Sequence, residues 1–94
     1  MDKRIALIEI IKSLQDKKVG GTVKDKRIID GKDLDMLIFK ATFKIDKNIK
    51  YEFRNLLEIF GVLQRSKEKI FYNNDGFYIN EKTIETFLKT EGAI

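Results

Sequence analysis

Apolar and polar residues alternate along residues 37–53. The apolar side chains take the odd positions and the polar side chains the even ones, with Ile38 as the one apolar exception. A period of two, carried mainly by aromatic and β-branched residues, is typical of strands that bury one face. The alternation breaks at 46–48, where a three-residue turn would join two antiparallel strands. We therefore predict a hairpin over 37–53.

The register of this hairpin predicts which side chains are buried. Its odd positions face the core, so Phe39, Phe43 and Ile45 are expected to be buried. Its even positions face water, so Lys40 and Lys44 are expected to be exposed.

Three other segments show helical spacing. Residues 2–18 carry an apolar stripe, and Asp2 can cap their first turn. A second helix is expected to start near Asn55, with Gly61 either a weak point inside it or its end. A last helix is expected to follow its cap at Asn80.

The remaining segments contain turn signals. Residues 21–31 hold few apolar residues around a charged run, so we expect an edge strand or a mobile loop that ends in an Asp-Gly turn. Residues 70–80 read as a second hairpin around a second Asp-Gly pair, which sets Tyr72 opposite Ile79.

These elements predict a single α+β domain over 1–94: an N-terminal helix, an antiparallel hairpin or three-stranded sheet, a helix, a second hairpin and a C-terminal helix. The order helix, three possible strands, helix is similar to that of double-stranded-RNA-binding domains. That family grips phosphates with lysines at the start of its second helix, where this chain has Asn55-Leu56-Leu57-Glu58.

An alternative makes 34–60 two helices. The run Leu57-Glu58-Ile59-Phe60-Gly61-Val62-Leu63 before a hairpin then resembles a winged helix-turn-helix domain. In this alternative Phe39 and Phe43 point toward water, and the charged Lys50 and Arg54 take positions where that fold usually buries apolar groups.

Composition excludes several kinds of chemistry. The apolar fraction of 43% and the charged fraction of 36% are those of a globular chain. The chain has no cysteine and no histidine, which excludes disulfides, thiolate metal sites and histidine-based catalysis. Three carboxylates at 30–35 lack the spacing of a calcium loop. We expect a protein that is not an enzyme and holds no cofactor and no metal.

Apolar runs are short. None approaches the roughly 20 residues of a membrane span, and charged residues interrupt 1–14, unlike the apolar stretch of a signal peptide. We expect no membrane association and a cytoplasmic location.

Net charge favours an anionic partner. The chain carries +4 at pH 7 and has a pI near 9.3, which permits attraction to nucleic-acid phosphates. On the polar face of the predicted hairpin, Lys44 lies opposite Lys50 and Lys40 lies opposite Arg54. Like charges opposed across a sheet cost stability, so such a face is typical of an anion-binding surface. The candidate nucleic-acid contacts are Lys40, Lys44, Lys50 and Arg54, with Lys24, Lys26 and Arg27 from the charged run.

Two functions follow from these features. The first is a small nucleic-acid-binding accessory protein that uses a cationic sheet face and, without an evident set of base-reading side chains, binds in a largely sequence-tolerant way. The alternative is a protein-protein interaction module, an inhibitor or a complex subunit, without nucleic-acid binding. Phe71 and Tyr78 share one face of the second predicted hairpin and are the candidate partner contacts.

Overall fold

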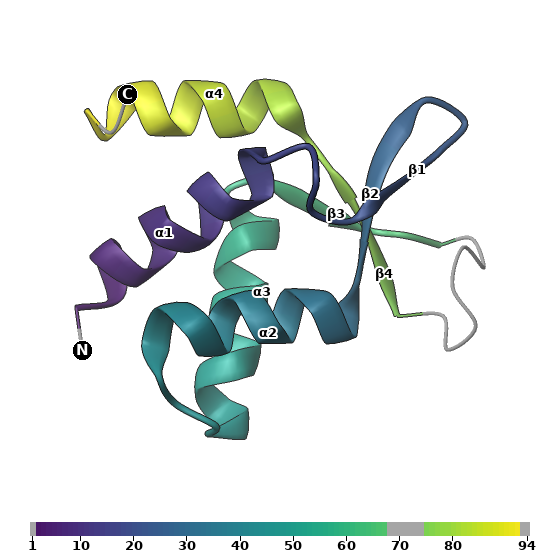
Figure 1. The fold of residues 1–94 in the computed structure, drawn as a ribbon. Helices are drawn as coiled ribbons and strands as arrows, with labels where there is room; N and C mark the ends of the chain where they lie inside the picture. The colour runs from purple at the N-terminus through teal and green to yellow at the C-terminus, as the bar shows by residue number, and fades with distance from the viewer. Residues whose placement is uncertain (1, 68–74, 93–94) are drawn as a thin grey trace.

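In the computed structural model, which describes residues 2–67 and 75–92, four helices gather to one side of a four-stranded antiparallel sheet (Figure 1). The α+β class is confirmed. The elements are α1 (Lys3–Gln15), β1 (Gly21–Val23), β2 (Lys26–Asp30), α2 (Gly31–Thr42), α3 (Lys47–Ile59), β3 (Leu63–Arg65), β4 (Gly76–Ile79) and α4 (Glu81–Thr90).

The first and last helices lie where their patterns predicted them. The Asp2 carboxylate accepts hydrogen bonds from two backbone N–H groups in the first turn of α1. The Asn80 side chain accepts one from the Thr83 N–H at the start of α4, at 3.1 Å. Both caps satisfy amides that a helix leaves unpaired at its first turn.

The hairpin predicted over 37–53 is wrong, because this segment forms most of α2 and the first half of α3. Ile38, the exception to the alternation, is 2% exposed and belongs to the buried face of α2. The odd residues point away: Phe39, Phe43 and Ile45 are 38%, 80% and 89% exposed. The predicted exposure of Lys40 and Lys44 is confirmed.

Side-chain caps explain where these two helices begin. Asp30 accepts a hydrogen bond from the Lys32 N–H at 2.9 Å, and Asp46 accepts one from the Asn48 N–H at 2.8 Å. The two segments that we interpreted as turns, at Asp30 and at Asp46, are therefore the starts of helices. The cationic sheet face does not exist, since its two pairs of opposed cations lie on helices or in the turn between them.

The helix predicted to start at Asn55 starts earlier, so Asn55 lies inside α3. Gly61 ends that helix in a left-handed conformation with φ of +74°, which confirms its role as a helix stop.

The sheet has the order β1-β2-β4-β3, with β4 paired on both sides. The edge strand expected within 21–31 is β1, which a two-residue turn of positive φ joins to β2. Ile79 pairs with Leu63, so its predicted pairing with Tyr72 is wrong, and Tyr72 itself lies outside the described residues. The element order is helix, two strands, two helices, two strands and helix, which agrees with the alternative in which 34–60 forms two helices.

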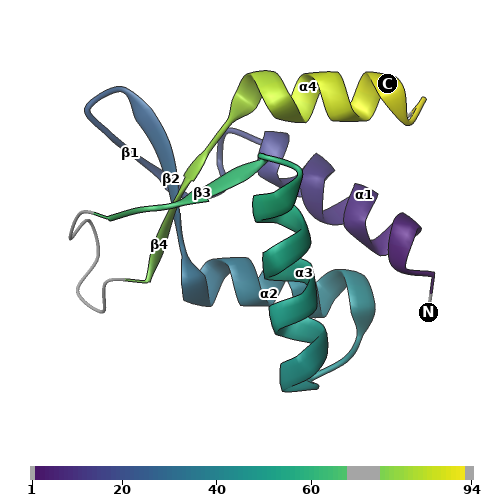
Figure 2. The same cartoon turned by 180° about the vertical axis from the view of Figure 1, so that it is seen from behind.

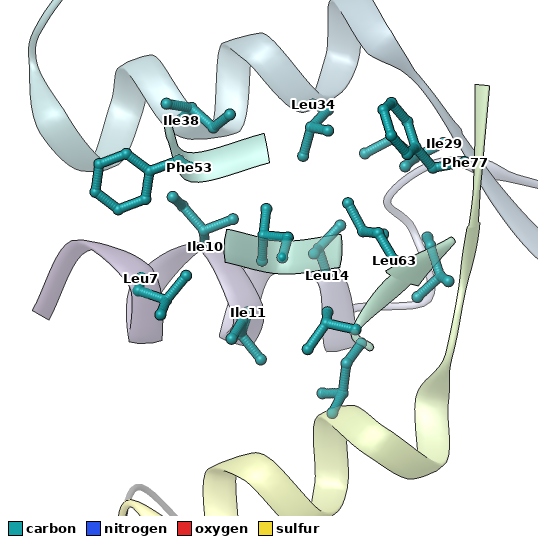
Figure 3. Packing of buried hydrophobic residues seen from close by; sticks show 14 of the residues in the cluster. Leu7, Ile10, Ile11, Leu14, Ile29, Leu34, Ile38, Phe53, Leu63 and Phe77 are labelled. Atoms are coloured by element: carbon teal, nitrogen blue, oxygen red, sulfur yellow. The ribbon is translucent and has the colours of Figure 1, made fainter. Parts of the chain in front are cut away.

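One apolar cluster joins the helices to the sheet (Figure 3). In the close-up, α1 lies between α2 and α4 and contributes more of the labelled side chains than any other element. These labelled residues are Leu7, Ile10, Ile11 and Leu14 from α1, Leu34 and Ile38 from α2, Phe53 from α3, and Ile29, Leu63 and Phe77 from the strands. Because α3 contributes its inner face to this core, its opposite face remains available at the surface.

We expect Phe43→Gly to raise the free energy of unfolding by about 1 kcal/mol, because Phe43 is exposed and has φ of +56°, a conformation that favours glycine. Phe53→Ala is the matched contrast: its ring is 0% exposed, and its loss should cost about 3–5 kcal/mol. Urea unfolding of both variants measures the two changes. A loss of stability in Phe43→Gly would contradict the assignment of Phe43 to the surface.

Candidate nucleic-acid interface

A tight turn sets α3 at a defined angle to α2. Phe43 ends α2 in the left-handed conformation, and its N–H donates to the Phe39 carbonyl at 2.7 Å. The Thr42 hydroxyl donates to the Ile38 carbonyl and accepts from the Lys44 N–H. The turn therefore satisfies its own polar groups before α3 begins.

Arg54 holds α3 against α2 and the start of β4. Its guanidinium donates to both carboxylate oxygens of Asp35, at 2.8 and 2.9 Å, and to the Gly31 carbonyl at 3.1 Å. It also donates to Asp75 at 3.2 Å, and its guanidinium carbon lies 5.6 Å from the centre of the Phe77 ring. Such a bidentate pair has a narrow geometry, so it fixes orientation as well as distance.

Burial of the Arg54 guanidinium lowers its pKa, but the hydrogen bonds and charges of Asp35 and Asp75 outweigh this effect and raise the pKa above its ordinary value. Gly31 makes the cluster possible, because a Cβ there would lie 2.0 Å from an Asp75 oxygen and 2.8 Å from an Arg54 nitrogen. Arg54 is therefore a structural cation engaged by both carboxylates, and its contact with a phosphate stays a prediction.

The outer face of α3 carries polar and aromatic side chains. Lys47, Asn48, Tyr51 and Asn55 are all exposed and follow the spacing of one helical face. In Figure 2, α3 lies in front of the other helices. The Lys47 and Lys50 ammonium groups lie 5.7 and 5.1 Å from the centre of the Tyr51 ring. One face of α3 therefore carries an ammonium group, two side-chain amides and a phenol.

Some predicted cations lie beside this face of α3. Lys44 is exposed in the turn before α3, and Lys40 is exposed in the last turn of α2. Lys50 is half-buried, with its ammonium 3.8 Å from an Asp35 oxygen. Lys44 and Lys50 line the same cavity.

The second basic run is split by the fold. Lys24 and Lys26 are exposed on the β1–β2 hairpin, which projects away from the start of α3 in Figures 1 and 2. Arg27 donates to three backbone carbonyls, of Leu14, Asp16 and Val19. Its side chain is only 11% exposed and closes the end of α1, and its contact with a phosphate stays a prediction.

The predicted partner contacts are only partly described. Tyr78 is half-buried in β4, with the Lys26 ammonium 5.4 Å from its ring centre. Phe71 lies outside the described residues. We did not predict from the sequence that one exposed helical face carries Lys47, Asn48, Tyr51 and Asn55. The signal that could have revealed this face is Asp46, which caps the helix.

Within residues 2–67 and 75–92, no group of three acidic, histidine or cysteine side chains could hold a metal ion. In the run at 30–35, Asp30 caps α2 and Asp35 binds Arg54. No helix of the described chain is long and apolar enough to cross a membrane.

Comparison with models of known protein families, with curated proteins and with solved structures found no match for this chain. The function is therefore inferred from the geometry of α2, the turn and α3.

Replacing Arg54 by Met should lower the free energy of unfolding by about 3 kcal/mol, because it removes the guanidinium that donates to Asp35, to Asp75 and to the Gly31 carbonyl. The partial exposure of both carboxylates, 28% and 30%, puts the expected loss at the lower end of the range for buried pairs. Arg54→Met with Asp35→Leu should lose less than the sum of the two single changes. Additive losses in urea unfolding would show that the two groups do not stabilise each other.

Proposed function

We propose that the protein is a small nucleic-acid-binding accessory protein that places α3 in the major groove of duplex DNA. The observation that carries this proposal is the exposed stripe of Lys47, Asn48, Tyr51 and Asn55 on the second helix of a helix-turn-helix. In such units the second helix enters the major groove, and residues near its start reach base edges.

Duplex DNA suits this surface better than duplex RNA. The major groove of B-form DNA is about 12 Å wide and admits an α-helix, whereas the major groove of A-form RNA is deep and narrow. Asparagine side chains match the hydrogen-bonding edge of adenine, and lysine matches that of guanine. Asn48 offers the first of these groups in the first turn of α3.

Charge near the start of α3 supports the same partner. Lys44, Lys47 and Lys50 lie there, while the Asp35 carboxylate is bound by Arg54 and the Asp46 side chain caps the helix. Phosphate contacts supply most of the affinity and fix the position of the protein. We propose that these contacts dominate and that base edges add a modest preference.

The proposal includes no catalysis and a cytoplasmic location. The lack of catalysis is supported by the lack of histidine and cysteine and by the engagement of the nearby carboxylates in structural hydrogen bonds.

The alternative, a protein-interaction module, is favoured by a different observation. Met36, Phe39, Phe43 and Ile45 leave large apolar side chains exposed on α2 and in the turn. Apolar surface of this kind marks contact sites on other proteins.

We expect the chain to bind a 20-base-pair DNA duplex more tightly than the matching RNA duplex or single strands. Lys47→Gln should weaken DNA binding similarly on different sequences and lower the salt slope of log K by about one unit, because one phosphate contact is lost. Fluorescence anisotropy over a series of salt concentrations measures both quantities.

Lys82→Gln is the matched control. It removes the same charge from the first turn of α4, far from the start of α3 in Figures 1 and 2, and should leave the salt slope unchanged. Equal losses in both variants, or no binding below about 100 μM at low salt, would contradict a role of α3 in DNA binding.

A further inference from the structure

A groove runs between the outer side of α2 and the start of α3. Its cavity volume is about 500 Å³. Met36, Phe39 and Ile45 supply apolar walls, and Lys32, Lys44 and Lys50 also line it. Tyr78, the predicted partner contact that the structure describes, does not line this groove.

Three of the four apolar residues of the groove lie outside the buried core, and only Ile38 belongs to it. Met36, Phe39 and Ile45 are 54%, 38% and 89% exposed, while the buried stripe of α2, with Leu34 and Ile38, packs against α1 and the sheet. Stability alone gives no reason for large apolar side chains at these positions. A cavity with apolar walls that is open to water is suited to receive apolar side chains of another molecule.

The charged residues that line the groove indicate the charge of a partner that would bind there. Among the residues that the structure describes, Lys32 and Lys44 form no ion pair. Lys50 shares Asp35 with Arg54, which already holds both oxygens of that carboxylate. Asp46, the other acidic residue of the groove, caps α3. The groove therefore presents net positive charge around apolar walls.

A second copy of the chain does not complement this surface, because it would bring the same lysines against each other. A phosphate backbone would satisfy the lysines but leave the apolar walls in water. A helix with apolar residues on one face and carboxylates beside them satisfies both, as in the recognition of amphipathic helices by grooves.

We propose that the groove between α2 and α3 binds an acidic amphipathic helix of a partner protein. Lys44 and Lys50 belong both to this groove and to the surface proposed for DNA, so the acidic helix and DNA compete for the protein. The competition rests on the proposed function; the docking of the helix does not.

Two labelled synthetic peptides test the docking on the full chain without DNA. Both carry leucine at helical positions i, i+3, i+4 and i+7; one carries glutamate at the flanking positions and the other lysine. Fluorescence anisotropy should give a Kd below about 100 μM for the acidic peptide and much weaker binding for the basic one.

Ile45→Asp should weaken binding of the acidic peptide by about tenfold or more, because it places a charge on the apolar wall. Ile45 is so exposed that its loss leaves the fold intact. Ile59→Asp is the matched control: Ile59 is 68% exposed at the far end of α3 and does not line the groove, so peptide binding should not change.

Three results would overturn the docking proposal: no binding of the acidic peptide, equal binding of both peptides, or a dimer in sedimentation equilibrium that Ile45→Asp dissociates. Adding the acidic peptide to a preformed DNA complex tests the competition. Peptide binding without DNA binding would overturn the proposed function alone, and DNA binding without peptide binding would overturn the groove alone.

Discussion

The buried ion pair between Arg54 and Asp35 is the interaction on which the arrangement of α2 and α3 depends. Arg54 extends from α3 across the start of α2 to Asp75 beside β4, so one guanidinium joins three segments that are distant in sequence. Desolvation makes such a pair a weak source of stability, but its geometry is demanding. The angle between the two helices determines both the outer face of α3 and the groove beside it, and Arg54 therefore supports both surfaces without reaching either ligand.

Helices with good caps were readable from the sequence, and the segment 37–53 was not. Both α1 and α4 begin at side chains that cap them, Asp2 and Asn80, and their apolar residues recur at helical spacing. In 37–53 the apolar residues alternate because α2 and its turn carry core residues on one side and exposed aromatics on the other. Ile38 was the one apolar residue at an even position, and it belongs to the true core face. A single exception was too little evidence against the alternation of all the other apolar residues in this segment.

The candidate site was half predicted for the same reason. Lys44 and Lys50 were identified from their opposition across a hairpin that does not form, and they lie near the start of α3 only because the turn and the first half of that helix contain them. Lys47 and Asn48 were missed because Asp46-Lys47-Asn48 was interpreted as a hairpin turn, whereas Asp46 caps a helix. The structural role of Arg54 could not be predicted, because its partners lie 19 and 21 residues away and meet only in the folded chain.

The exposed aromatics that misled the sequence analysis are also the strongest sign of function. Interpretation of a sequence assumes that large apolar side chains enter the core, and this assumption holds for a surface that has no partner. Phe43 combines 80% exposure with a backbone conformation that favours glycine, so neither packing nor local geometry explains a phenylalanine there. Phe39 and Ile45 break the same assumption in the groove beside it. Several residues in one small area thus oppose the requirements of the fold, and the proposed docking of another molecule on this surface gives their presence a reason.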